Sequence, residues 1–101
     1  MLKVGGIYVS PVEVESAIVR HEKVLEVAVV GHADKDGLIK PKAFIVLREG
    51  IRPDDALSDE IKAFVKAELA SYKYPRWIEF LDELPKTATG KIQRFKLRDA
   101  T

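Results

Sequence analysis

Residues 24–47 of the chain, VLEVAVVGHADKDGLIKPKAFIVL, contain two apolar runs that are separated by a polar segment. The runs at 24–30 and 42–47 are short and rich in β-branched residues, which is typical of buried strands. The segment 31–37 between them combines Gly, Asp and Lys and predicts a turn. Two strands joined by one turn favour an antiparallel hairpin, here with a loop longer than the tightest types.

A helix is expected before this hairpin, because the sequence carries a complete helix start. Ser10 can cap the helix, Pro11 suits its first position, and Glu13 completes a capping box. The predicted helix runs from residue 11 to about 20–22. Its core face follows the helical spacing of Val14, Ala17, Ile18 and His21.

A second helix is expected over residues 55–69, where one apolar stripe is surrounded by charged residues. The helix must stop before Pro75, because the residue that precedes a proline avoids the α region. The stripe consists of Leu57, Ile61, Phe64, Val65 and Leu69.

Residues 77–81, WIEFL, predict a third strand, and a short helix is expected from about Arg94. At the other end, Gly5 and Gly6 adjoin a short β-prone run and predict a tight bend. The resulting fold class is α+β, with a small, mostly antiparallel sheet of about three strands flanked by helices. A short N-terminal Gly-rich β segment and a C-terminal basic loop and helix complete it.

The composition is that of one small globular domain spanning residues 1–101, with 47% hydrophobic and 33% charged residues. A net charge of +1 gives no reason to expect binding to nucleic acid or to a membrane surface. The absence of cysteine excludes disulfides and thiolate sites and fits a cytoplasmic protein. Neither His21 nor His32 has metal-ligand spacing, so no metal site is predicted and structural roles are expected for both. The chain begins inside an ordered-looking segment, so we expect it to be a piece of a longer protein.

The basic stretch at residues 84–98, LPKTATGKIQRFKLR, is the candidate functional segment. Its small residues at 87–90 do not suit a helix or strand interior, and Gly90 permits a sharp turn that projects Lys91 outward. No acidic residue follows until Asp99. This pattern suggests a flexible loop that delivers a lysine to an anion. The neighbouring cations are Lys86, Arg94, Lys96 and Arg98.

Two simpler interpretations of this segment stay open. A Gly-Lys pair in a polar loop also occurs at solvated hairpin tips, and a basic cluster can accompany a helix end. A phosphate-binding P-loop is excluded, because Ile92 stands where that motif needs Ser or Thr and Pro85 stands where it needs its first glycine.

Two longer stretches together resemble a known family. VGGIYVSPVEVE at residues 4–15 and YKYPRWIEFLDELPKTATGKIQRFKLR at 72–98 are similar to the small C-terminal domain of adenylate-forming acyl-CoA synthetases. The resemblance covers essentially the whole chain, and within the family it points to aryl-CoA ligases of the benzoate and hydroxybenzoate type. It implies a mobile C-terminal domain of an AMP-forming acid–thiol ligase, inactive without its large N-terminal domain.

The resemblance implies a two-step reaction that uses Mg-ATP and coenzyme A. A carboxylate first attacks the α-phosphate of ATP to give an acyl-adenylate, and the thiol of coenzyme A then displaces AMP. Lys91 is implied as the lysine that reaches into the large domain during adenylation. The loop formed by Gly5, Gly6, Ile7 and Tyr8 is implied to face the active site during thioester formation, and the Mg²⁺ ligands are implied to lie outside this chain.

Further site residues are implied by position. Tyr72, with Lys73 beside it, matches an aromatic residue that contacts the coenzyme A nucleotide in some aryl-CoA ligases, although Tyr72 could equally be the last core residue of its helix. The segment 85–91, PKTATGK, resembles a site for acetylation of Lys91 by a protein lysine acetyltransferase, reversed by a deacetylase.

Two other functions remain open at this level. One is an adenylation domain that loads a carrier protein, and the other is a non-catalytic α+β binding module whose basic loop docks an acidic partner. The residues that line the pocket for the carboxylic acid are implied to lie outside this chain.

Overall fold

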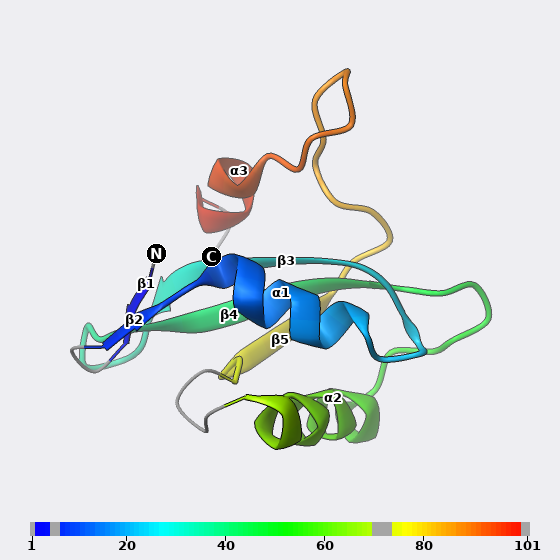
Figure 1. The fold of residues 1–101 in the computed structure, drawn as a ribbon. Helices are drawn as coiled ribbons and strands as arrows, with labels where there is room; N and C mark the ends of the chain where they lie inside the picture. Colours follow the sequence, from blue (N-terminus) through cyan, green and yellow to red (C-terminus); the bar gives the residue numbers. More distant parts are fainter. Residues whose placement is uncertain (1, 5–6, 70–73, 100–101) are drawn as a thin grey trace.

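The computed structural model describes residues 2–4, 7–69 and 74–99, with side chains described for residues 10–69 and 74–97. Gly5, Gly6, Tyr72 and Lys73 lie outside the described residues. Figure 1 shows the order of the elements. They are β1 (Leu2–Val4), β2 (Ile7–Val9), α1 (Pro11–Val19), β3 (Val24–Ala33), β4 (Ile39–Leu47), α2 (Asp55–Glu68), β5 (Trp77–Phe80) and α3 (Arg94–Asp99).

The main sheet has three strands in the order β3-β4-β5. β3 and β4 pair antiparallel, with Ala28 opposite Phe44, which confirms the predicted hairpin. β4 and β5 pair parallel, with Lys42 opposite Trp77, so the sheet is mixed. A parallel pair needs a long crossover connection, and the segment that contains α2 supplies it. The predicted α+β class, with three strands and flanking helices, is confirmed.

The β3–β4 hairpin is longer than the sequence pattern suggested, because β3 continues into the predicted turn as far as Ala33 and β4 begins at Ile39, before the predicted start at residue 42. The Asp34 carboxylate accepts hydrogen bonds from the backbone N–H groups of Asp36 at 2.9 Å and Leu38 at 3.0 Å, which closes a shorter turn. His32 therefore lies on the strand, opposite Lys40, and its ring packs edge-on against Trp77 at 4.7 Å. The expected structural role of His32 agrees with this contact.

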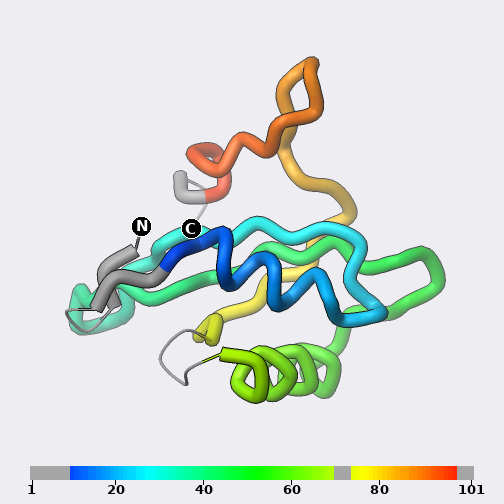
Figure 2. The backbone as a smooth tube through the Cα atoms, viewed as in Figure 1, coloured from blue at the N-terminus to red at the C-terminus, as the bar shows by residue number. Residues whose placement is uncertain are grey.

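Both faces of the sheet are covered, which explains why β3 and β4 are apolar at successive positions. On one face, alternate strand residues pack against α1 and α2; the buried set is Val14, Ala17, Ile18, Val24, Val27, Val29, Ala43, Ile45, Leu57, Ile61 and Val65. On the other face the remaining strand residues meet the segment that leads to α3; the buried set is Ala28, Val30, Phe44, Val46, Leu84 and Leu97. The basic segment is thus built onto its own side of the sheet (Figure 2).

α1 begins at the predicted cap Ser10, and α2 begins at a cap, Asp54, that the sequence analysis did not predict. Ser10 Oγ accepts from the N–H of Glu13 at 3.4 Å at the start of α1, and an Asp54 carboxylate oxygen accepts from Leu57 N–H at 2.7 Å at the start of α2. The helices are short of their predicted ends by a residue or more, since they end at Val19 and Glu68.

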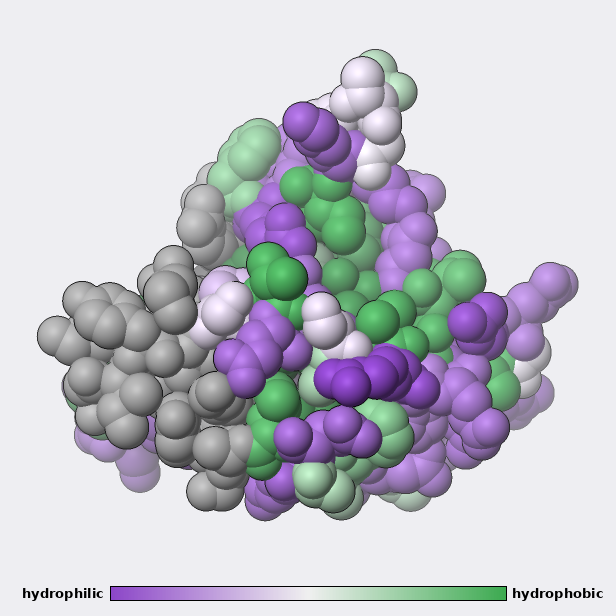
Figure 3. All heavy atoms as spheres, viewed as in Figure 1, coloured by the Kyte–Doolittle hydropathy of each residue, from purple (hydrophilic) through white to green (hydrophobic). Residues whose placement is uncertain are grey.

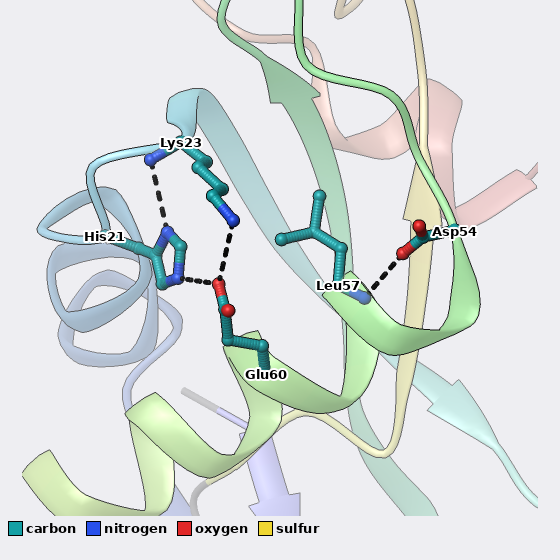
Figure 4. A network of polar contacts seen from close by, with 5 residues as sticks. All are labelled: His21, Lys23, Asp54, Leu57 and Glu60. Atoms are coloured by element: carbon teal, nitrogen blue, oxygen red, sulfur yellow. Dashed lines mark hydrogen bonds and ion pairs between the residues drawn. The ribbon is translucent and has the colours of Figure 1, made fainter.

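His21 joins the end of α1 to α2 (Figure 4). Its Nδ1 accepts the backbone N–H of Lys23 at 3.2 Å, so Nε2 carries the proton that is donated to the Glu60 carboxylate at 2.7 Å. The ring is 7% exposed and packs edge-on against Phe64 at 5.2 Å. His21 is therefore a packing and hydrogen-bonding residue, as the sequence predicted.

β1 and β2 form a separate antiparallel pair, with Lys3 opposite Tyr8, and β1 lies against β4. This confirms the predicted N-terminal β segment. Within the described part of the chain, no helix combines the length and the apolar character that crossing a membrane would require.

Candidate functional site

Lys91 closes a compact hydrogen-bonded turn, residues 87–91, which we call the Lys91 turn. The N–H of Gly90 donates to Thr87 O at 2.9 Å and the N–H of Thr87 donates to Lys91 O at 2.8 Å. The N–H of Lys91 donates to Thr87 Oγ1 at 3.1 Å, and the Thr87 and Thr89 hydroxyls lie 3.0 Å apart. Gly90 has φ +86°, a conformation that L side chains rarely adopt. The turn at Gly90 is as predicted, but the backbone of this loop is well hydrogen-bonded.

The two stems of the turn are fixed to the sheet. Lys86 and Ile92 form an antiparallel bridge, and Gln93 N–H donates to Pro85 O at 2.8 Å. Leu84, before the turn, is 4% exposed, and Ile92, after it, packs against the same core cluster. The turn itself projects away from the rest of the chain, as the tube in Figure 2 shows. The Lys91 turn thus projects from two stem segments that are packed against the core.

Among the cations whose side chains the structure describes, two of the basic cluster have polar partners and two, Lys91 and Lys96, have none. Lys86 pairs with Glu26 of β3 at 2.5 Å, and Arg94 pairs with Glu15 of α1 at 2.5 Å. Lys91 is exposed, and no residue that the structure describes forms a hydrogen bond or an ion pair with its ammonium group. The side chain of Lys91 is therefore exposed where an anion could reach it, and its predicted role stays a prediction.

Arg94 is held by a two-pronged contact. Its Nε donates to Glu15 Oε2 at 2.9 Å and its Nη2 donates to Glu15 Oε1 at 2.5 Å. The hydrogen bond from the Glu15 carboxylate raises the pKa of Arg94 above its ordinary value, and partial burial opposes this. Glu15 Oε2 also accepts the N–H of Val29 at 2.7 Å, so the same carboxylate contacts β3.

A groove of about 350 Å³ lies at the foot of the Lys91 turn, between α1 and β3. Its walls include three exposed apolar side chains, Val12 (63% exposed), Val19 (46%) and Leu25 (48%), together with Ile92 below the turn. The space-filling view shows hydrophobic side chains gathered below the turn on this face (Figure 3). The face that carries Lys91 therefore also carries apolar surface.

Of the other predicted site residues, the structure describes only the backbone of Ile7 and Tyr8. Ile7 and Tyr8 lie in β2, on the N-terminal hairpin, and their side chains are not described. Gly5, Gly6, Tyr72 and Lys73 fall outside the described residues, so their roles stay predictions.

Sequence reasoning missed Glu15 and Glu26 as partners of the basic segment. Glu15 was part of the stretch that carried the family resemblance, but its side-chain contact with Arg94 spans 79 positions in the chain. The only local signal was an excess of cations at 86–98 without nearby acids, which implies that some of them find partners elsewhere.

The fold and the exposed Lys91 at the end of its turn fit one known protein family. A family model described as the AMP-binding enzyme C-terminal domain matches residues 13–91. The chain belongs to that family.

Its relatives are several-fold longer. The benzoate–CoA ligase of Thauera aromatica is 71% identical over 99% of this chain and 19% of its own length. The 4-hydroxybenzoate–CoA/benzoate–CoA ligase of Rhodopseudomonas palustris is 56% identical over 100% of this chain and 19% of its own length. The solved structure of the anthranilate CoA ligase AuaEII in complex with anthranoyl-AMP matches with a TM-score of 0.94 and 61% identity, over 99% of this chain and 19% of that one. The chain thus spans about a fifth of the length of these proteins.

Proposed function

We propose that this chain is the C-terminal domain of an ATP-dependent, AMP-forming carboxylate–CoA ligase whose acid is benzoate or another aromatic carboxylate. The observation that carries the proposal is the exposed Lys91 ammonium at the tip of a hydrogen-bonded turn, where none of the described residues pairs with it. The aromatic substrate rests on the names of the relatives that match nearly the whole chain. Because the chain is about a fifth of those proteins, activity requires the larger remaining part.

Lys91 would act in the adenylation step. Two anions, the carboxylate and ATP, must approach each other, and negative charge is redistributed in the transition state. An ammonium group with three donors can contact the carboxylate and a phosphate or ribose oxygen at once. The hydrogen-bonded turn supports this role, because a donor aimed in advance needs little reorganisation during the reaction.

The remaining parts of the reaction are assigned as follows. The loop from Gly5 to Tyr8 would face the active site during thioester formation, since glycine lets the backbone approach a narrow ligand such as the pantetheine chain closely. Tyr72 and Lys73 would contact the coenzyme A nucleotide. Mg²⁺ would neutralise phosphate charge, and we assign its ligands, the ATP phosphate site and the acyl pocket to the larger part of a cytoplasmic enzyme.

The larger part of the same polypeptide is the partner that we assign to the groove below the Lys91 turn. Val19 and Leu25 are nearly half exposed there, and docking would remove this apolar surface from water while Lys91 enters the active site. Val19→Asp in the full-length protein should slow adenylation and leave the free energy of unfolding of this domain nearly unchanged. An unchanged adenylation rate would remove the groove from the interface.

Acetylation of Lys91 would regulate the enzyme by removing this charge. We propose a protein lysine acetyltransferase and a deacetylase as partners. The acetylated full-length protein should lose pyrophosphate exchange but still form thioester from preformed adenylate. Normal pyrophosphate exchange by that protein would rule out this regulation.

The full-length protein should be assayed for carboxylate-dependent pyrophosphate exchange with benzoate, hydroxybenzoates and short aliphatic acids, and for AMP release with and without coenzyme A. We expect exchange with an aromatic acid and release that depends on coenzyme A. AMP release that needs a carrier protein instead would favour an adenylation domain of the carrier-loading type. If no acid supports pyrophosphate exchange, the remaining hypothesis is a non-catalytic binding module. Such a module should lose affinity for an acidic partner gradually as its cations are replaced.

A further inference from the structure

Among the described side chains, the Glu15–Arg94 pair joins the basic segment to the rest of the domain by two hydrogen bonds, and the Lys86–Glu26 pair by one. The Glu15–Arg94 contact is two-pronged, with Arg94 Nε and Nη2 each donating to a different Glu15 oxygen. The Glu15 side chain is 12% exposed and that of Arg94 is 39% exposed, so solvent screens this pair less than a surface pair. A guanidinium fork held in this way fixes direction as well as distance.

Glu15 is itself fixed in place. It lies on α1 directly after the buried Val14, and its Oε2 accepts the N–H of Val29, which belongs to the edge strand of the sheet. The carboxylate therefore connects three elements: α1, β3 and, through Arg94, the start of α3.

Arg94 lies three residues after Lys91, and the two residues between them are both held in place. Ile92 packs on the core cluster of the second sheet face, and Gln93 N–H is bonded to Pro85 O. A displacement of Arg94 must therefore be transmitted to the base of the Lys91 turn. On the opposite stem, Lys86 pairs with Glu26, but both of these side chains are about one-third exposed and the contact has a single hydrogen bond.

From this geometry we infer that Glu15 and Arg94 are positioning residues for adenylation, which aim the Lys91 ammonium from outside the reacting atoms. The inference rests on the proposed function of Lys91 and extends it to two residues that do not touch substrate. The Arg94 guanidinium fixes the position of the start of α3 through its two hydrogen bonds. The Glu15 carboxylate accepts both of them and is itself held by α1 and β3.

The test uses the full-length protein with two conservative variants. Arg94→Lys keeps the positive charge but removes the fork. Glu15→Gln keeps an oxygen that can accept the Val29 N–H but removes the carboxylate that receives both Arg94 donors. The matched control is Arg20→Ala, which removes another Arg–Glu pair of the same domain, Arg20–Glu68 at 3.5 Å, where both side chains are exposed.

We expect both variants to lower the kcat of pyrophosphate exchange by about 10- to 100-fold, the upper bound being that of a misplacement by about 1 Å. The KM for ATP and the rate of thioester formation from preformed adenylate should stay at their native values, as should both half-reactions of the control. Because Arg94 acts through Lys91, Lys91→Ala combined with Arg94→Lys should be no slower in exchange than Lys91→Ala alone.

The positioning role is overturned if the two variants slow both half-reactions to the same degree, if they leave exchange unchanged, or if the effects of Lys91→Ala and Arg94→Lys on exchange multiply. If Lys91→Ala by itself leaves pyrophosphate exchange intact, the proposed function of Lys91 fails first and the positioning role fails with it. Circular dichroism and thermal unfolding of each variant separate all of these outcomes from loss of the fold.

Discussion

Replacing Gly90 by alanine should slow adenylation through the backbone alone. Gly90 has φ +86°, and no atom lies within 4 Å of the position that a Cβ would occupy. The alanine methyl group therefore meets no neighbour, and the cost comes only from the unfavourable dihedral angle. That cost is about 1–2 kcal/mol for an L residue in the left-handed region.

The strain slows the reaction if it opens the Lys91 turn in the resting protein, because the turn must then be formed again, at that cost, in the transition state. Each 1.36 kcal/mol corresponds to about a tenfold change in rate, so Gly90→Ala should lower pyrophosphate exchange by about 5- to 30-fold. Gly90→Asn should retain more activity than Gly90→Ala, because asparagine tolerates positive φ better than other L residues. Thioester formation from preformed adenylate should be unchanged in both variants.

The chain offers a matched control. Gly50 has φ +85°, also has open space at its Cβ position, and lies between β4 and α2, away from the Lys91 turn. Gly50→Ala should therefore cost a similar free energy of unfolding without slowing exchange. The reasoning is refuted if Gly90→Ala exchanges pyrophosphate at the native rate, or if Gly50→Ala slows exchange as much.

Three further predictions concern the turn, the hairpin and the core. Thr87→Val removes the acceptor of the Lys91 N–H and should slow pyrophosphate exchange about two- to tenfold, whereas Thr87→Ser should not; equal rates in both would contradict a role for this hydrogen bond. The hydrogen bond from Lys40 lowers the pKa of Asp34, so the stability that Asp34 contributes is present above its unfolded pKa of about 3.9 and is lost as the pH falls through the lower folded value. Urea unfolding should accordingly show Asp34→Asn to be less stable at pH 7 and the difference to vanish in more acidic solution; a difference that is independent of pH would exclude this ion pair. Ile61→Ala, at a fully buried position of α2, should lower the free energy of unfolding by about 2–5 kcal/mol, and a loss below about 1 kcal/mol would place Ile61 outside the core.

Local patterns were enough to predict most elements of this fold. Ser10 with Pro11 marked the start of α1, and the two apolar runs at 24–30 and 42–47 marked the β3–β4 hairpin. These features depend on neighbours within a few positions, which is the range that periodicity and capping describe.

The parallel pairing of β4 with β5 could not be predicted in the same way. β5 joins the sheet after a crossover that includes α2, and its register, with Lys42 opposite Trp77, depends on how that crossover packs. The extent of the β3–β4 hairpin was also missed, because Gly31 and the polar residues up to Gly37 suggested a turn where the Asp34 side chain allows the ladder to continue.

For the candidate site, the sequence predicted the cation but not its surroundings. Gly90 and the small residues before Lys91 indicated a projecting turn, which the structure contains. Which cations of the basic cluster are paired depends on Glu15 and Glu26. The packing of α1 and β3 brings these two glutamates close to Arg94 and Lys86. Contacts of this range leave no periodic signal in the sequence.

The most direct test of the central claim is the effect of Lys91→Ala on the two half-reactions of the full-length protein. Lys62→Ala, on α2, is the control, since Lys62 lies on the element that covers the other face of the sheet. We predict that Lys91→Ala lowers pyrophosphate exchange by about 10²- to 10³-fold while thioester formation from preformed adenylate proceeds at the native rate. Equal loss of both half-reactions, or native exchange in Lys91→Ala, would contradict the assignment of Lys91 to adenylation.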